Sequence, residues 1–248
     1  MGDPRFIFVH GGGQGGWVWD ETIAALAVQS GGAARCLALD GPGCGAKRGR
    51  DTSAMTFEDV TRELLADVAA SGLTDAVLVG HSQAGMHLPH MAELAPAGTF
   101  RRLVFVTCSA PLPGWTTLDQ MGHDIGHGDD PDRVGYPVAA AASMAERYDA
   151  MFCNDMSRAE ADAFLANLGG DGWPMCCYSY SDWQREHLRD HDVAYVLCER
   201  DAALTPEWQA RFAARLRARR VHRLDAGHQA MNTRPHGLAE ILLAEAGL

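Results

Sequence analysis

A serine, an aspartate and a histidine occur along the chain in an order that suits nucleophilic catalysis. Ser82 lies in the segment GHSQAG (80–85), Asp201 in CERD (198–201) and His228 in DAGH (225–228). A serine hydroxyl becomes a strong nucleophile when a histidine accepts its proton, and a carboxylate orients that histidine. We therefore expect Ser82 to attack a carbonyl group, His228 to act as general base and then acid, and Asp201 to fix the tautomer of the imidazole.

The residues around Ser82 suit a sharp turn between a strand and a helix. An apolar run (76–79) precedes the serine segment and a helical pattern follows it. Such a strained turn brings two backbones together, so it needs small residues two places before and two places after the nucleophile. Gly80 and Ala84 meet that need, although alanine replaces the usual second glycine. A simple tight turn is the alternative interpretation.

A glycine-rich segment, HGGGQGGW (10–17), follows the first apolar run. Its glycines allow backbone N–H groups to approach a ligand oxygen. It also contains a G-x-G-x-x-G spacing, for which Asp40 would bind the ribose of a dinucleotide. His10 and Trp17 fit that motif poorly, and a dinucleotide leaves the serine segment unexplained. We therefore expect no nucleotide or flavin cofactor.

One further spacing raises the question of a metal ion. His123 and His127 bracket Asp124 at an interval that can hold a metal on a helix. The surrounding run (122–128) is too rich in glycine to predict a helix with assurance. We therefore expect no metal.

Six short apolar runs alternate with helical patterns along most of the chain. These runs are continuous rather than alternating, which is typical of parallel strands covered on both faces; they lie at 6–9, 34–39, 76–79, 103–106, 194–197 and 220–224. Thr56 and Thr205 are the expected N-caps of two helices, the second with Pro206 in its first turn. The pattern predicts a doubly wound α/β fold with a mostly parallel sheet of about six strands.

The strand–helix alternation fails between Pro111 and His191. This stretch is too long for a loop and too apolar for a linker. We expect residues 1–110 and 192–248 to form the core and 111–191 a helical cap over the carboxyl edge of the sheet, where open α/β sheets bind ligands. An insertion whose aromatic residues pack only on each other is the alternative. The side chains that we expect to contact substrate are His10, Trp115, Met121, Tyr148, Phe152, Trp173, Trp183 and Met231.

These segments together resemble the α/β-hydrolases, and within them the plant methylesterase and hydroxynitrile lyase group with its bacterial relatives. The resemblance lies in FVHG (8–11), GGW (15–17), DGPGCG (40–45), the serine segment and HQAM (228–231) with Pro235 and Leu238. It implies the α/β-hydrolase fold. It also implies that the backbone N–H groups of Gly12 and Gln83 form an oxyanion hole.

The chain departs from that group at two positions beside the expected catalytic residues. Gln83 replaces the apolar or cysteine residue usual after the nucleophile. Gln229 stands where the hydroxynitrile lyases carry a lysine that handles the cyanide. The second departure argues against cyanohydrin cleavage.

Composition restricts the partners of the protein. The net charge of −11 argues against nucleic-acid binding, which needs a basic face. No apolar run approaches the roughly 20 residues of a membrane span, and the first residues do not resemble an export signal. Seven scattered cysteines indicate reduced thiols in the cytoplasm. We expect a cytoplasmic protein whose partner is a small-molecule substrate, with no nucleic acid and no membrane, and a homodimer stays open.

These observations favour a serine hydrolase that cleaves an ester or thioester of a hydrophobic small molecule through an acyl-enzyme. The same fold could instead serve a C–C bond hydrolase, a lyase or cyclase acting on a natural product, or a type II thioesterase. A ligand-binding protein with slow turnover is an alternative of a different class. Because the triad sets the mechanism and the cap sets the substrate, the sequence leaves these alternatives open.

Overall fold

The computed structural model describes residues 3–122, 131–139, 141–168 and 170–247. In this part of the chain a six-stranded sheet has the order β2-β1-β3-β4-β5-β6, and every neighbouring pair is parallel. The strands are β1 (Arg5–Val9), β2 (Arg35–Leu39), β3 (Ala76–His81), β4 (Phe100–Val106), β5 (Val193–Cys198) and β6 (Arg220–Leu224). The predicted doubly wound α/β fold is confirmed.

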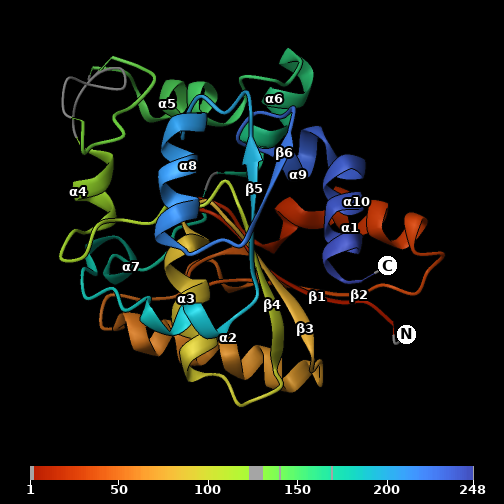
Figure 1. The fold of residues 1–248 in the computed structure, drawn as a ribbon. Helices are drawn as coiled ribbons and strands as arrows, with labels where there is room; N and C mark the ends of the chain where they lie inside the picture. Colours follow the sequence, from red (N-terminus) through yellow and green to blue (C-terminus); the bar gives the residue numbers. More distant parts are fainter. Residues whose placement is uncertain (1–2, 123–130, 140, 169, 248) are drawn as a thin grey trace.

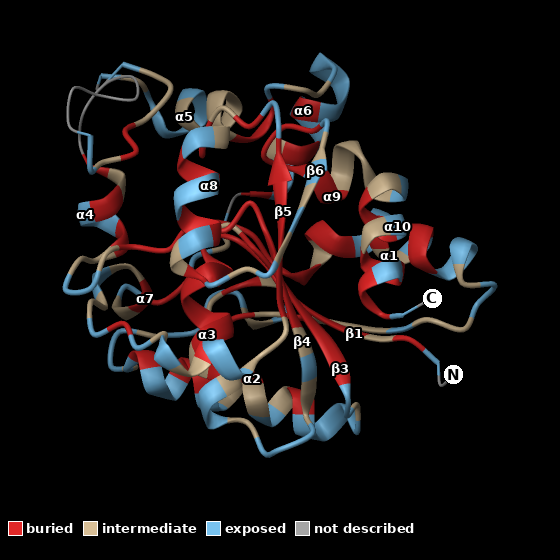
Figure 2. Ribbon diagram, in the orientation of Figure 1, coloured by how far each residue is buried: buried red, intermediate tan, exposed pale blue. Residues whose placement is uncertain are grey.

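Helices cover both faces of this sheet (Figure 1). One face packs against α2 (Phe57–Ser71), α3 (Ala84–Leu94) and α8 (Pro206–Arg215). The opposite face packs against α1 (Asp20–Gln29) and α10 (Pro235–Glu245). Because successive strand residues point to opposite faces, a strand covered on both sides is apolar throughout. Figure 2 shows the central strands buried, and all six residues of β3 are buried.

The N-caps predicted for two helices differ in how they act. The Thr56 hydroxyl accepts a hydrogen bond from the backbone of Asp59, whose carboxylate accepts in return, so α2 begins with a complete capping box. Thr205 occupies the cap position before α8, but its side chain makes no capping hydrogen bond. Pro206 starts that helix with a backbone angle already suited to it.

Between β4 and β5 the described residues form short helices, as predicted for residues 111–191. These helices are α4 (Thr117–Met121), α5 (Met144–Phe152), α6 (Arg158–Asn167), α7 (Cys176–Ser179) and the 3₁₀ helix Glu186–Asp190. Figure 1 shows α5 and α6 at the end of the sheet to which β5 points. The short helix α9 (Ala230–Thr233) lies outside the insertion, just before α10.

Several apolar residues of the insertion pack into the two apolar clusters that cover the faces of the sheet. Trp173 and Trp183 belong to the cluster with α2, α3 and α8, whereas Phe152 and Phe164 belong to the cluster with α1 and α10. The insertion is therefore fastened to the sheet on both sides. Its treatment as a separate cap domain with the bounds 111 and 191 stays a prediction.

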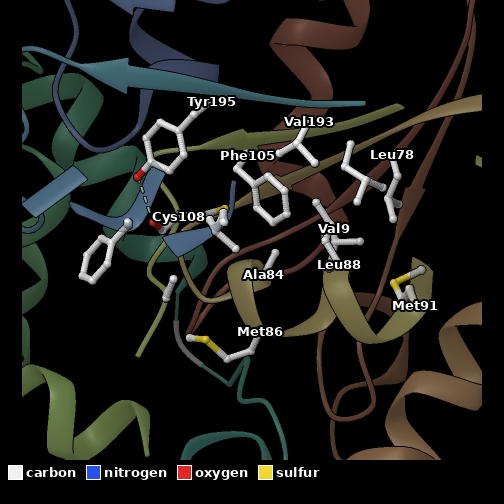
Figure 3. Packing of buried hydrophobic residues seen from close by; sticks show 14 of the residues in the cluster. Val9, Leu78, Ala84, Met86, Leu88, Met91, Phe105, Cys108, Val193 and Tyr195 are labelled. Atoms are coloured by element: carbon white, nitrogen blue, oxygen red, sulfur yellow. Dashed lines mark hydrogen bonds between the residues drawn. The ribbon is translucent and has the colours of Figure 1, made fainter. Parts of the chain in front are cut away.

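Helix α3 starts so close to the sheet that only small side chains fit. A Cβ atom at Gly80 would lie 2.6 Å from a methyl group of Leu88 and 2.9 Å from Cβ of Ala84. A Cβ atom at Gly85 would lie 2.0 Å from the carbonyl oxygen of Ser109. Figure 3 shows Ala84 and Leu88 on the side of α3 that faces the buried strands. The small residues at the end of β3 and at the start of α3 are therefore a packing requirement of the turn.

We expect Gly85→Ala to lower the free energy of unfolding by roughly 1–3 kcal/mol, the usual cost of overpacking. Alanine stabilises an ordinary helix interior relative to glycine by up to about 1 kcal/mol, so a loss would report the contact with the Ser109 carbonyl. Urea denaturation followed by circular dichroism measures the change. Gly172→Ala is the control, because a Cβ atom there meets no atom within 4 Å. Equal effects of the two substitutions would contradict this account.

Candidate active site

Ser82 occupies the turn between β3 and α3 in a strained backbone conformation. Its φ is +52°, a region that costs a non-glycine residue about 1–3 kcal/mol. Its N–H donates to the carbonyl of Val106 (3.2 Å), and its carbonyl accepts from the N–H groups of Gly85 (3.1 Å) and Ser109 (3.2 Å). These hydrogen bonds attach the turn to β4, to the segment after β4 and to the first turn of α3. They therefore maintain the strained backbone conformation of Ser82.

The structure brings the three predicted catalytic side chains together at the carboxyl ends of the strands. Nε2 of His228 lies 3.0 Å from Oγ of Ser82, and Nδ1 of His228 lies 2.7 Å from Oδ2 of Asp201. The other Asp201 oxygen accepts from the backbone N–H groups of Ala203 (2.8 Å) and Leu204 (2.9 Å). Only 3% of Asp201 and 1% of His228 is exposed. This geometry suits transfer of the serine proton to the imidazole.

Thr107 is a further partner of the carboxylate that the sequence analysis did not single out. Its hydroxyl donates to Oδ2 of Asp201 at 2.5 Å, and its φ is +38°. It directly follows β4, at the same edge of the sheet as the turn after β5. A polar residue directly after a predicted strand is the signal that could have indicated it. Asp201 thus receives four hydrogen bonds, which fix the orientation of its carboxylate.

His81 supports His228 from behind. Nε2 of His81 lies 2.9 Å from the backbone carbonyl of His228, so in the matching tautomer it donates to that oxygen. Complete burial lowers the pKa of His81 well below its ordinary value, which keeps the ring neutral beside the triad. His81 therefore holds the backbone of the histidine without adding a charge.

The two residues whose backbone N–H groups are expected to form an oxyanion hole line the same pocket. Gly12 and Gln83 both line it, and among the described residues neither N–H donates a hydrogen bond to the protein. The side chain of Gln83 donates to the carbonyl of Cys177 at 3.1 Å. Gln83, which is not the residue usual at this position in the methylesterase and hydroxynitrile lyase group, thus connects the turn after Ser82 to α7 in the insertion.

A pocket of about 370 Å³ opens onto Ser82 and His228. Its floor is formed by residues of the glycine-rich segment 10–17, called the glycine loop below, and by residues that follow the strands. Its wall comes from the insertion and is mostly apolar or aromatic: Thr117, Leu118, Met121, Tyr136, Met144, Arg147, Tyr148, Met151, Phe152, Met175 and Tyr178. Met121, Tyr148 and Phe152 are among these wall residues, and their predicted contact with substrate stays a prediction.

His10 and Trp173, predicted to contact substrate, are buried beside the glycine loop instead. The indole N–H of Trp173 donates to the carbonyl of Gly11 at 3.0 Å. Its ring stacks between those of His10 and His87, with centroids 4.6 and 4.3 Å away. Trp173 also lies against Gly41, where a Cβ atom would be 2.3 Å from the indole. The prediction is corrected: Trp173 anchors the insertion to the core.

Trp115, Trp183 and Met231 also lie outside the wall of this pocket. The indole N–H of Trp183 donates to the carbonyl of Trp115 at 2.7 Å, which joins two parts of the insertion. The Arg133 guanidinium lies 5.3 Å from the centroid of the Trp115 ring. Met231 is fully buried in the cluster with α1 and α10. These three side chains stabilise packing, which corrects the prediction that they contact substrate.

Tyr178 is the pocket residue most directly placed beside the glycine loop, and the sequence analysis did not select it. Its hydroxyl lies 3.2 Å from the position that a Cβ atom of Gly12 would take. Burial raises its pKa above the ordinary range, so the hydroxyl stays protonated. Tyr178 belongs to the four-residue helix α7, which is too short for its inward face to be visible in the sequence.

The residues considered as ligands of a dinucleotide or a metal are Asp40 and the group His123, Asp124 and His127. The carboxylate of Asp40 accepts from the backbone N–H groups of Gly16 (2.7 Å) and Ala46 (2.9 Å), so it joins two loops of the core. His123, Asp124 and His127 lie outside the described residues. Among the described residues, no group of three or more histidine, cysteine, aspartate or glutamate side chains could hold a metal ion. None of the described helices is long and apolar enough to span a membrane.

Comparison with known proteins identifies the family. Residues 6–241 match the model of the alpha/beta hydrolase family, and the chain belongs to that family. A probable esterase, PIR7A, from rice (Oryza sativa subsp. indica) is 36% identical over 114 residues, covering 46% of this chain and 42% of the rice protein. The chain thus matches less than half the length of this relative.

The chain is also similar to a protein named as a methylesterase and to a solved α/β-hydrolase structure. Putative methylesterase 13 of Arabidopsis thaliana is 31% identical over 127 residues, covering 50% of this chain and 28% of that protein. A solved extracellular α/β-hydrolase from a Paenibacillus species, described as homologous in structure and function to tobacco salicylic acid binding protein 2, superposes with a TM-score of 0.77. It is 19% identical and covers 98% of both chains, which confirms the fold.

Buried histidines beside the glycine loop link stability to pH. The ring of His87 is stacked between Phe57 (4.9 Å) and Trp173 (4.3 Å), and neither ring nitrogen has a hydrogen-bond partner among the described residues. Burial lowers the pKa of His87 from 6.5 to about 3 and that of His10 to about 4. Below pH 6.5 the unfolded chain therefore binds protons at these residues that the folded chain excludes.

We expect the free energy of unfolding to fall as the pH falls from 6.5 towards 4, by up to about 1.4 kcal/mol per pH unit for each such histidine. His87→Phe keeps a ring in the stack and removes one linked proton, so its stability should depend less steeply on pH. Urea denaturation across this range measures the slope. His236→Gln, which removes an exposed histidine, is the control. Identical slopes for the wild type and His87→Phe would refute the linkage.

Proposed function

We propose that this protein is a serine hydrolase that cleaves a carboxylic ester, or a thioester, of a hydrophobic small molecule. The observation that carries the proposal is the hydrogen-bonded series Ser82–His228–Asp201 at the floor of an apolar pocket. The rice relative named a probable esterase supports the same reaction class.

In the first half-reaction, Oγ of Ser82 attacks the substrate carbonyl while Nε2 of His228 accepts its proton. The N–H groups of Gly12 and Gln83 donate to the oxyanion of the tetrahedral intermediate, and one such donor is typically worth about 3 kcal/mol. His228 then passes the proton to the departing alcohol or thiol, which leaves an acyl group on Ser82. Asp201 keeps the imidazole in the tautomer that both transfers need.

In the second half-reaction, His228 removes a proton from water and the resulting hydroxide attacks the acyl carbon. The same N–H groups stabilise the second oxyanion. Collapse of the intermediate breaks the bond to Ser82, whose oxygen recovers the proton from His228. The products are a carboxylic acid and a regenerated enzyme.

The pocket wall indicates what kind of ester fits. Four methionines line it, Met121, Met144, Met151 and Met175, together with aromatic side chains. Methionine is flexible and polarizable, so such a wall accommodates apolar groups of more than one shape.

The seven cysteines are free thiols, which supports the cytoplasm as the place of action.

An organophosphonate should label Ser82 in a one-to-one ratio, because among the residues that the structure describes only the hydroxyl of Ser82 lies within hydrogen-bond distance of a histidine ring. Ser82→Ala should abolish labelling and reduce ester hydrolysis to near the background rate. Mass spectrometry of labelled peptides locates the adduct. Ser179→Ala, at an exposed serine of α7, should react as the wild type does. Labelling at another serine, or full activity of Ser82→Ala, would exclude the proposed nucleophile.

A series of p-nitrophenyl esters from acetate to aromatic acids should show kcat/KM rising with the apolar area of the acyl group. Each Å² of apolar surface removed from water contributes roughly 25 cal/mol to the free energy of binding. Steady-state kinetics with the esters and with matched thioesters measures the trend. A flat or falling series would show that the pocket does not select apolar acyl groups. If only the thioesters were turned over, the protein would be assigned as a thioesterase and not as an esterase.

A further inference from the structure

The segment that follows α5 contacts the loop that carries the catalytic histidine. One carboxylate oxygen of Asp155 accepts from the backbone N–H of Gly227 (2.8 Å) and from the hydroxyl of Thr233 (2.9 Å). Three residues earlier, the ring of Phe152 stacks on the ring of His228 with centroids 5.5 Å apart and planes 16° apart. The insertion thus touches both the backbone and the side chain of the histidine loop.

The same segment also contacts the loop that carries the catalytic aspartate. The side-chain amide of Asn154 donates to the carbonyl of Arg200 at 2.6 Å, directly before Asp201. Arg200 in turn connects the two loops: its backbone N–H donates to Ala226, and its guanidinium pairs with the carboxylate of Asp225 at 2.7 Å. Asn154 and Asp155 therefore hold the aspartate and histidine loops from one side.

The fit at Gly227 is close. A Cβ atom there would lie 2.5 Å from Oδ1 of Asp155 and 2.6 Å from the amide oxygen of Asn154. The side chain of Asp155 is only 2% exposed, and the nearest Arg200 nitrogen is 3.7 Å away. A carboxylate buried in this way loses hydration, so it needs its hydrogen bonds to the histidine loop.

Helix α5 links these contacts to the substrate pocket. Its residues Met144, Tyr148 and Met151 form part of the pocket wall, and its C-terminal end leads directly into Asn154 and Asp155. One continuous segment of the insertion therefore contacts the pocket on one side and both catalytic loops on the other.

We propose that Asn154 and Asp155 form a clamp from the insertion that sets the positions of His228 and Asp201. They are positioning residues, since they act through the triad; the inference rests on the proposed hydrolase function for its kinetic consequences. His228 must stay within hydrogen-bond reach of two partners at once. A displacement of the order of 1 Å can cost about a hundredfold in rate.

Three variants test the clamp. Asp155→Ala removes both acceptor bonds, so kcat per active site titrated with the phosphonate should fall about tenfold to a hundredfold while KM changes less than about threefold. Asp155→Asn retains an acceptor oxygen for Gly227 and Thr233 and should restore most of the rate. Asp149→Ala, which removes a carboxylate paired with Arg158 on the surface of α5, should match the wild type.

Proton NMR of the Nδ1–H of His228 gives a measurement that does not depend on turnover. This resonance, assigned by its loss in His228→Gln, should weaken or shift in Asp155→Ala and persist in Asp155→Asn. If Asp155→Ala does not fold, Asn154→Ala is measured in its place, with a severalfold fall in kcat and the same NMR change expected.

The outcomes separate the clamp from the function. Wild-type kcat and an unchanged resonance in Asp155→Ala, or in Asn154→Ala where that variant replaces it, would overturn the clamp. An Asp155→Asn variant as impaired as Asp155→Ala would also overturn it, because the hydrogen bonds would not be what matters. Absence of phosphonate labelling at Ser82 in the wild type would remove the hydrolase proposal, while the NMR comparison would still decide whether Asp155 positions His228.

Discussion

The site depends on one imidazole keeping two hydrogen bonds at the same time. Nε2 of His228 is 3.0 Å from Ser82 and Nδ1 is 2.7 Å from Asp201, and the three residues follow different strands. No local stretch of chain can impose both distances. They result from the parallel sheet, which brings strand ends to one edge, and from partners such as Thr107 and His81 that restrain each loop. The strain at Ser82 is tolerated because this surrounding structure leaves the turn no alternative.

The sequence was sufficient to predict the fold because buried strands leave a short-range pattern. It was also sufficient to predict that the three side chains lie close together, because each follows a predicted strand of one parallel sheet. Continuous apolar runs mark buried parallel strands, and small residues around Ser82 mark a close strand–helix contact. Residues that act through long-range packing could not be predicted in this way. Thr107 is an unremarkable threonine until the sheet places it beside Asp201, and Asp155 contacts Gly227 across 72 positions of chain.

The insertion shows why composition alone misassigned several aromatic residues. Tryptophan is large and carries one N–H donor, which in a buried tryptophan usually has an acceptor. Trp173 and Trp183 find backbone carbonyls and pack into the core, whereas much of the pocket wall is built from methionines and tyrosines. Which face of a short helix such as α7 points inward depends on tertiary contacts, including the bond from Gln83 to Cys177. Periodicity carries no information about a helix of four residues.

The division of the insertion between two apolar clusters has a consequence for how the molecule comes apart. Trp173 and Trp183 are packed with one face of the sheet, and Phe152 and Phe164 with the other. Detaching the insertion would therefore expose both layers to water at once, and the loss of apolar burial would be shared by the whole sheet. Such an arrangement favours unfolding of the whole molecule in a single cooperative transition over separate unfolding of the insertion.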